Sequence, residues 1–271
     1  QIILRLWCFF FSLMIITSWN VNSVRARIEN IKNYLKKYSP DIVMMQEIKT
    51  EDPTFPYDDF SSLDYECHVF GQKSYNGVAI ISKNKLENVR IDLIKDKQKQ
   101  SRIISAEFKH KKKNIQIINI YTPNGNPVDT DKYTYKKEWL DSLIKQLKTL
   151  SKKNENIILA GDFNILPSEE DAYNIKGFED DALYRLEIRK KFREMINLGF
   201  HDAYRHIHGE IEGYTYWDYM RGAWQKNNGL RIDHFLVSNS LLNIVKNVNI
   251  NKDPRGKEKP SDHTPIEIEL T

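Results

Sequence analysis

The feature that most restricts the fold of this chain is a series of short apolar segments bounded by Pro, Gly, Asn or Asp, a pattern typical of β-strands. Helical spacing of apolar residues is less frequent, and it predicts helices after Ser23 and over residues 133–150 and 182–198. Residues 51–64, rich in Asp, Pro and Ser, are expected to form a loop. The predicted strands span residues 14–19, 41–46, 78–82, 102–108, 115–121, 156–160, 230–238 and 264–270.

Strands that outnumber helices argue against a simple parallel Rossmann sheet, and the chain carries neither a glycine-rich dinucleotide loop nor a Walker loop. The pattern favours an α/β fold in which two mixed β-sheets pack together and helices cover the outside. In the last strand Ile266, Ile268 and Leu270 alternate with Glu267 and Glu269, which predicts a sheet with one face in water.

The length of 271 residues suits one large domain, and no Gly/Ser linker, Pro-rich stretch or internal repeat divides it. We therefore expect a single domain over residues 14–271. Residues 2–16 are mostly apolar, but they are too few for a comfortable membrane span and no small-residue cleavage site follows. Because this segment runs directly into the first strand, we interpret residues 1–13 as a non-native or unstructured extension, in preference to a signal peptide or membrane anchor.

The formal net charge of +4 is compatible with a nucleic-acid partner but does not require one. The two cysteines, Cys8 and Cys67, cannot build a disulfide framework and show no metal-ligand spacing. A reducing compartment is the default for such a chain, so we expect a cytoplasmic protein. We also expect the protein to act as a monomer.

Polar side chains suited to binding a metal or a phosphate lie at the ends of the predicted strands. Taken singly, each is more often a solvated loop charge or a turn residue. Taken together they predict one cleft, because strand ends at the same edge of a sheet converge in space. These residues are Asn20, Glu47, Asp162, Asn164, Asp233, Asp262 and His263.

Hydrolysis of a phosphodiester requires a cation, a base that activates water, and donors that hold the anionic transition state. Magnesium prefers oxygen ligands and keeps several waters, so Glu47 is the predicted ligand, with Asn20 and Asp262 beside it. Asp162 is the predicted base, and Asn164 would hold the phosphate or the water.

His263 completes this predicted chemistry as a donor to a phosphoryl oxygen. A histidine performs that role when a carboxylate fixes its tautomer, and Asp233 is the candidate partner.

The segments that carry these residues resemble, in the same order, the motifs of the exonuclease III family of abasic-site endonucleases, within the wider endonuclease/exonuclease/phosphatase superfamily. The resemblance covers about residues 14–271, and the ordered set is far more specific than any one motif. The matching segments are SWNVNSVRAR at 18–27, MQEIK at 45–49, GQKSYNGVAI at 71–80, NIYTPNG at 119–125, AGDFNI at 160–165, GLRID at 229–233 and KPSDHTP at 259–265.

This resemblance implies a four-layer α/β sandwich that incises DNA 5′ of abasic sites, leaves a 3′-hydroxyl, and removes 3′ blocking groups or nucleotides. The implied partner is double-stranded DNA with abasic sites or blocked 3′ ends, and the implied cofactor is Mg²⁺, with Mn²⁺ as the alternative ion. The same match implies that Glu47 binds the metal and that Tyr121 bonds the phosphate, with Asn124 nearby.

The family also recognises the missing base with a small apolar pocket, and Tyr216, Trp217 and Leu230 match its positions. A flipped-out sugar without a base fits a pocket that is too small for a nucleotide with one. Without the resemblance, core packing would be the better interpretation of both aromatic residues. The candidate contacts to the DNA backbone are Arg25, Lys49, Lys73, Tyr75 and Arg221.

Three alternatives remain at the level of sequence. Another superfamily enzyme, acting on lipid headgroups or inositol phosphates, would share Glu47, Asp162, Asn164 and His263. A DNA-binding module with lost chemistry would lack one of those residues, and all are present. A membrane-associated protein would use residues 2–16 as its anchor.

Overall fold

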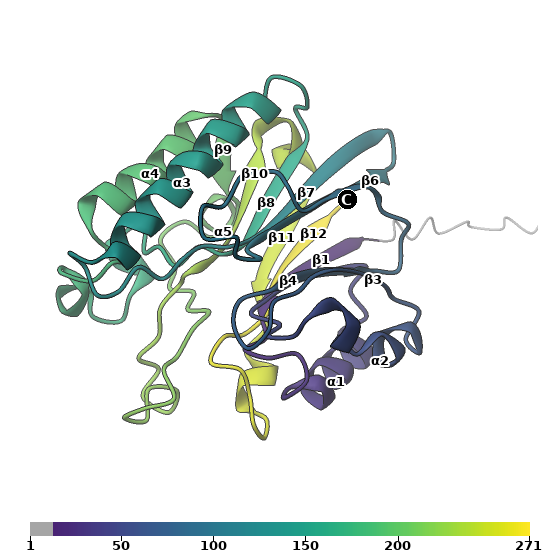
Figure 1. The fold of residues 1–271 in the computed structure, drawn as a ribbon, viewed down its shortest axis with the longest axis horizontal. Coiled ribbons are helices and arrows are strands. Elements are labelled where there is room, and N and C mark those ends of the chain that lie inside the picture. The colour runs from purple at the N-terminus through teal and green to yellow at the C-terminus, as the bar shows by residue number, and fades with distance from the viewer. Residues whose placement is uncertain (1–12) are drawn as a thin grey trace, which may run out of the picture.

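The computed structural model describes residues 13–271, and the expectation for residues 1–12 lies outside this described part. Two six-stranded β-sheets pack face to face, and helices cover the outer face of each (Figure 1). This arrangement confirms the predicted α/β sandwich of two mixed sheets flanked by helices. Within residues 13–271, no helix combines the length and the apolar character needed to cross a membrane.

The described part of the chain has more strands than helices, and β3 to β7 follow one another without a helix between them. The strands are β1 (Met14–Asn20), β2 (Ile42–Gln46), β3 (Glu66–Phe70), β4 (Val78–Ser82), β5 (Glu87–Arg90), β6 (Ile103–His110), β7 (Lys113–Tyr121), β8 (Ile157–Asp162), β9 (Phe200–Asp202), β10 (Asp233–Ser238), β11 (Val245–Ile250) and β12 (Ile266–Leu270). The helices are α1 (Ile28–Tyr38), α2 (Tyr57–Ser61), α3 (Asp131–Leu150), α4 (Leu186–Asn197) and α5 (Ala203–His208).

Both sheets mix parallel and antiparallel pairs. The first sheet has the order β11-β12-β1-β2-β4-β3, and the second has the order β5-β6-β7-β8-β10-β9. The parallel pairs are β1 with β2 and β7 with β8, at the centre of each sheet. Strands β12 and β10 run antiparallel to β1 and β8, so they begin at the edge where β1 and β8 end.

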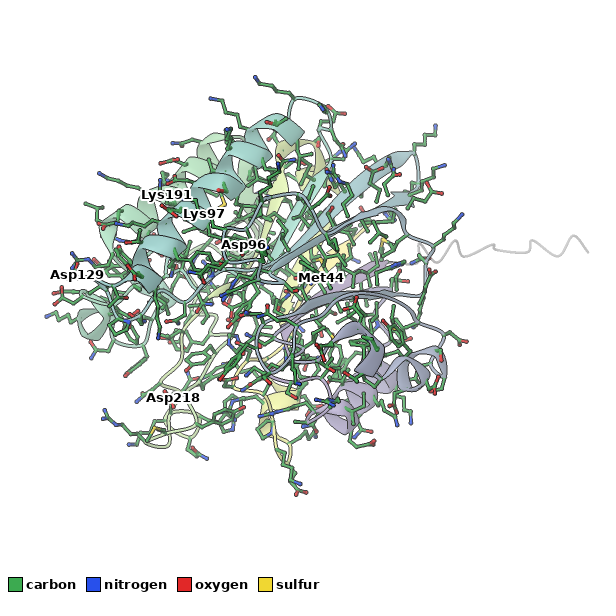
Figure 2. All side chains as sticks on the ribbon, viewed as in Figure 1. Met44, Asp96, Lys97, Asp129, Lys191 and Asp218 are labelled. Carbon is green, nitrogen blue, oxygen red and sulfur yellow. The ribbon has the colours of Figure 1, made fainter. Side chains whose placement is uncertain are left out.

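Alternation of side chains along the strands builds three apolar layers. In β2, Ile42 and Met44 point into the core between the two sheets, where Figure 2 labels Met44. Val43 and Met45 point the other way and pack under α1 and α2. Because both faces of this strand are covered, it reads as one continuous apolar run in the sequence.

The outer helices bury one face each. Helix α1 places Ile31 and Leu35 against the first sheet, while α3 places Trp139 and Leu143 against the second. Figure 1 shows α3 and α4 together on one outer face, and α1 and α2 on the opposite outer face.

Several local predictions were wrong. The segment 51–64 was expected to be a loop, but it contains the short helix α2. Phe60 of this helix is fully buried, and the polar residues around it gave no indication of a helix. Helix α1 begins at Ile28, because residues 24–27 form a turn first, although the Ser23 hydroxyl does accept the Ala26 N–H at 3.4 Å. Helix α4 begins at Leu186, because residues 182–184 form a turn and Arg185 has a non-helical ψ of 140°. Strands β3, β5, β9 and β11 were not predicted.

The alternation of apolar residues and Glu predicted that one face of the last strand lies in water, and the structure shows that it does not. Glu267 is buried under α1 and accepts hydrogen bonds from the Tyr34 hydroxyl at 2.8 Å and the Asn251 amide at 2.9 Å. A buried carboxylate is stable when such donors replace water. The alternation therefore marks a polar network beneath a helix.

Gly161 in β8 brings the backbone closer to its neighbour than any other residue would allow. Its φ is +143°, and a Cβ atom built there would lie 2.0 Å from the Ile120 carbonyl oxygen of β7. This close approach fixes the end of β8, immediately before Asp162.

We expect Gly161→Ala to lower the free energy of unfolding by at least about 2 kcal/mol, because the new methyl group collides with backbone that cannot move away. Chemical denaturation of the purified proteins measures this. Gly177→Ala is the matched control, since its Cβ would meet only the Asn174 side chain at 3.8 Å. Equal stability of the two variants would contradict this account of β8.

Candidate active site

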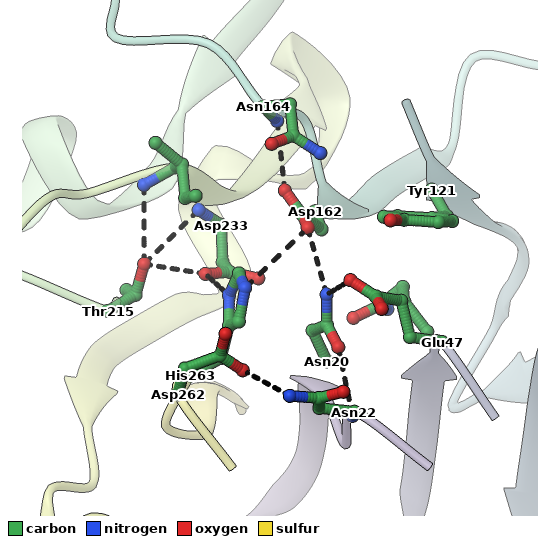
Figure 3. A network of polar contacts seen from close by, with 12 residues as sticks. Asn20, Asn22, Glu47, Tyr121, Asp162, Asn164, Thr215, Asp233, Asp262 and His263 are labelled. Atoms are coloured by element: carbon green, nitrogen blue, oxygen red, sulfur yellow. Dashed lines mark hydrogen bonds and ion pairs between the residues drawn. The ribbon is translucent and has the colours of Figure 1, made fainter. Parts of the chain in front are cut away.

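Five of the seven polar residues at the strand ends line one cleft of about 740 Å³, and the other two, Asn20 and Asp233, are buried next to them. Its floor carries Glu47, Tyr121, Asp162, Asn164 and His263, which come from both sheets. Figure 3 shows Glu47, Asp162 and His263 directed toward one another. The structure therefore confirms that these distant segments of the sequence converge.

Asn20 joins the two carboxylates of this cluster. Its side-chain nitrogen donates to Glu47 Oε1 at 2.8 Å and to Asp162 Oδ2 at 2.9 Å, while its oxygen accepts from the Asn22 N–H. Asn20 is fully buried at the end of β1. It thus holds the carboxylates in place. The predicted role of metal ligand would require its oxygen to face the cleft, but that oxygen is bonded to the Asn22 N–H.

Glu47 follows β2 and stays ionised. Burial alone would raise the pKa of its carboxyl, but the Lys49 ammonium at 2.9 Å and the hydrogen bond from Asn20 lower it. Lys49 also donates to Asn22 Oδ1 at 2.5 Å. Lys49 was predicted to contact the DNA backbone, and in this structure it compensates the charge of Glu47.

Asp162 lies at the end of β8 with almost no exposure to solvent. Burial raises the pKa of its carboxyl to about 7, against the attraction of the nearby His263 ring. Its Oδ1 accepts the backbone N–H of Asn164 at 2.9 Å, which fixes the direction of the carboxylate. A carboxylate with a pKa near neutrality can take up a proton under physiological conditions.

His263 connects two acidic residues. Its Nδ1 bonds to Asp233 Oδ2 at 2.8 Å, and its Nε2 lies 3.8 Å from Asp162 Oδ2. Burial alone would lower the pKa of the imidazole, but the Asp233 carboxylate raises it to about 10. His263 is therefore a cation at neutral pH and can donate a proton or a hydrogen bond from Nε2.

Asp233 is held by a residue that the sequence did not indicate. The Thr215 hydroxyl donates to Asp233 Oδ2 at 2.6 Å, and it accepts the backbone N–H of Asp233 at 3.2 Å. In the sequence Thr215 stands between two aromatic residues, Tyr214 and Tyr216, and only the fold brings it next to Asp233 (Figure 3).

Of the three predicted metal residues, only Glu47 belongs to a group that could hold an ion. Glu47, Asp162 and His263 offer ligand atoms within 4.8 Å of one another. Since Mg²⁺ prefers oxygen to nitrogen, the Glu47 carboxylate is the fitting donor for a hard cation, with Asp162 beside it. Asp262 lines the cleft, but its Oδ1 accepts from Asn22 Nδ2 at 3.0 Å and it is not part of this group.

Two further predicted residues lie where a phosphate could reach them. The pKa of the Tyr121 hydroxyl is raised well above its ordinary value by burial and by the Glu47 carboxylate, so the group remains a donor. Arg102 lies over its ring, 4.6 Å from the centroid. Asn124 donates to Asn164 Oδ1 at 3.2 Å, and Asn164 donates to the Thr122 carbonyl at 3.0 Å.

Lys136 supports this side of the cleft from below, and the sequence gave no signal of its role. It is fully buried in α3, and its ammonium donates to the carbonyls of Asn124 at 2.9 Å, Asn164 at 2.6 Å and Ala182 at 3.0 Å. All three donors of the ammonium are thus used. One side chain ties together three loops that border the cleft.

The predicted sugar pocket is present in part. Tyr216 and Leu230 line the cleft, and the Tyr216 ring lies 4.9 Å from the His263 ring. Trp217 is fully buried, donates to Asn227 Oδ1 at 3.3 Å, and is not among the residues lining the cleft. Trp217 had been expected to form part of the pocket wall, but it lies behind the wall and supports it.

The predicted DNA contacts Arg25 and Tyr75 are both exposed outside the cleft. Tyr75 is 71% exposed on the loop before β4. Arg25 lies in a separate groove beside α1, together with Lys37, Lys257 and Lys259. Their positions are compatible with contacts to a large anionic partner that extends beyond the cleft.

We expect Asp233→Asn to lower the pKa of His263 by roughly two pH units, because the charge and the hydrogen bond of Asp233 are lost while burial still disfavours the cation. An NMR titration of the His263 ring in metal-free protein measures this. Asp218→Asn is the control, since Asp218 lines the same cleft but is exposed and has no hydrogen bond to His263. An unchanged His263 pKa in Asp233→Asn would contradict the assigned pairing.

We expect Lys136→Met to lower the free energy of unfolding by about 3 kcal/mol, because three buried carbonyls lose their donors. Denaturant titration would show the loss, and Lys132→Met, an exposed position on the same helix, serves as the control. Comparable stability of both variants would mean that the carbonyls find other partners.

Comparisons with known proteins place this geometry in a family. The Endonuclease/Exonuclease/phosphatase family matches residues 17–263. An exodeoxyribonuclease of Bacillus subtilis (strain 168) is 33% identical, over 94% of this chain and 98% of the relative. An exodeoxyribonuclease III of Haemophilus influenzae is 32% identical, over 93% and 98% respectively.

Solved structures agree with the sequence relatives. A 3′ phosphatase from Neisseria bound to a product DNA hairpin has a TM-score of 0.89 and 33% sequence identity. The match covers 95% of this chain and 99% of the phosphatase chain. An AP endonuclease from Archaeoglobus fulgidus has a TM-score of 0.88 and 32% identity with the same coverage. The chain therefore belongs to the endonuclease/exonuclease/phosphatase family, among relatives named exodeoxyribonucleases and AP endonucleases.

Proposed function

We propose that this protein is a Mg²⁺-dependent DNA repair phosphodiesterase that incises the backbone 5′ of abasic sites and removes blocking groups or nucleotides from 3′ ends. The observation that carries the proposal is the convergence of Glu47, Asp162 and the Asp233–His263 pair in one cleft. Relatives with closely similar chains are named for nuclease activity on DNA, including one bound to a DNA product.

The residues suggest how the phosphodiester would be broken. Asp162 takes a proton from a water molecule whose oxygen attacks phosphorus, the bond from phosphorus to the 3′ oxygen breaks, and that oxygen takes up a proton from solvent water. The upstream strand then carries a 3′-hydroxyl and the abasic residue keeps the phosphate. The pKa of about 7 for Asp162 suits a base that must be free at neutral pH and regain a proton during the reaction.

Charge on the phosphoryl oxygens is balanced by donors from two sides. His263 offers its protonated Nε2, and the Tyr121 hydroxyl and the Asn164 amide lie on the opposite side of the cleft. A divalent ion held by Glu47 would neutralise further charge on those oxygens. Donors held in a fixed, water-poor site stabilise a transition state more than the same groups in water.

The proposal extends to the partner and the setting. We propose that double-stranded DNA lies across the cleft, with Arg25 and Tyr75 as contacts to its backbone outside the cleft. We propose further that one copy of the chain is sufficient and that it works in the cytoplasm. Mn²⁺ would serve in place of Mg²⁺, because both are hard cations that accept oxygen ligands.

A labelled duplex with one abasic-site analogue provides the first test. We expect a single nick 5′ of the lesion in the presence of Mg²⁺, no nick with EDTA, and no nick in the undamaged duplex. If the folded protein leaves this duplex intact but hydrolyses a small phosphodiester, the small-molecule alternative replaces the proposal.

Asp162→Asn should reduce incision by at least about a thousandfold, because the amide cannot accept a proton, while affinity for the duplex stays within a few-fold. Gel-based incision and fluorescence anisotropy in EDTA measure the two effects. Asp129→Asn, at an exposed position before α3, is the control for the same chemical change. Incision that persists in Asp162→Asn would show that another group is the base.

A further inference from the structure

The cleft does not end at the residues that correspond to a pocket for a base-free sugar. Leu230 forms isolated β-bridges with Tyr216 on one side and with Ala172 on the other. Beyond Ala172, the same cleft continues along the segment that connects β8 to α4. We call this continuation the annex and define it by the lining residues Tyr173, Phe178, Leu183, Asn228 and Leu230.

The walls of the annex are aromatic and are held in place. The rings of Tyr173 and Phe178 meet edge to face, with centroids 6.2 Å apart at an angle of 84°. The backbone N–H of Tyr173 donates to the Gly229 carbonyl at 3.1 Å, which anchors this segment beside Leu230. Phe178 packs on the small apolar cluster that contains Leu183 and Leu230.

The annex leaves ring surface accessible to a ligand. Tyr173 is 45% exposed although it packs against a neighbouring ring, and Phe178 is half-buried. Exposed aromatic faces of this kind bind nucleobases by stacking, without regard to the identity of the base.

The annex also carries a polar group suited to the edge of a base. Asn228 is half-buried, and its backbone N–H is fixed by a bond to the Ala223 carbonyl at 2.8 Å. Among residues 13–271, no hydrogen bond employs its side-chain amide. An amide offers both a donor and an acceptor, which is the pattern that base edges require.

The dimensions agree with a ligand larger than a sugar. The whole cleft measures about 740 Å³, within the range of roughly 300 to 1,000 Å³ that encloses drug-sized molecules. A base-free sugar phosphate would leave the aromatic end of such a cleft to water. The sequence had implied a pocket too small for a nucleotide with its base, and the structure does not close the cleft behind Leu230.

We propose that the annex receives the nucleobase of a base-bearing nucleotide at a DNA 3′ end, with its face against Phe178, its rim toward Tyr173 and its polar edge at Asn228. The phosphodiester of that nucleotide would then lie at Asp162 and His263. This inference rests on the proposed function, and it assigns the removal of intact 3′ nucleotides to residues that incision at an abasic site does not need.

The test compares two activities of each variant: removal of an intact 3′-terminal nucleotide and incision at an abasic-site analogue. Phe178→Ala should lower the ratio of the first kcat/KM to the second by at least about tenfold, since stacking is lost only for the substrate with a base. The loss should be larger for purines than for pyrimidines, because their ring face is larger. Phe178→Trp should restore the ratio.

Two variants separate stacking from packing. Phe178→Leu keeps the apolar contact with the cluster but lacks a ring, so it should fold normally and still show the altered ratio. Ile175→Ala is the matched control, because Ile175 packs on the same cluster without lining the cleft. Its ratio should stay within twofold of the original.

Each outcome has a distinct meaning. A wild-type protein that cuts neither DNA would overturn the proposed function itself. A wild-type protein that cuts both, with the ratio unchanged in Phe178→Ala and Phe178→Leu, would overturn the annex alone. An equal fall in Ile175→Ala would also overturn it, since packing would then explain the effect.

Discussion

The active site depends on two buried acids that lie side by side. The antiparallel register of β8 and β10 sets Asp162 opposite Asp233, where two carboxylates would repel each other in a region that excludes water. The His263 imidazolium lies between them and compensates both charges. Since a slip of one residue in this register would turn one of the acids to the other face of the sheet, the strand pairing itself maintains the catalytic arrangement.

The same principle of compensated buried charge recurs around the cleft. Lys49 balances Glu47, and behind the site the fully buried Arg231 bonds to Asp171 at 2.7 Å and Asp202 at 2.8 Å. Such pairs contribute little net stability, but breaking one leaves an unpaired charge at a high cost. They therefore fix the positions of loops more than they strengthen the fold.

Sequence reasoning recovered the fold class and the convergence of Glu47, Asp162, Asn164, Asp233 and His263, because strand ends carry recognisable polar residues. It misplaced the start of two helices, which follow local turns, and it missed short strands that form by pairing with other strands. It assigned Trp217 to a pocket wall, since the sequence cannot show which of two adjacent aromatic residues points inward. It gave no signal for Lys136 or Thr215, whose partners are distant loops.

The sequence by itself determined which residue types stand at the strand ends, and in what order, because apolar periodicity and motif spacing are local properties of the chain. Only the tertiary structure decided the charge state of Asp162 and His263, the orientation of Asn20, and the extent of the cleft beyond Leu230. Those features depend on burial and on partners brought together from both sheets, and neither burial nor contact across sheets is encoded at any single position.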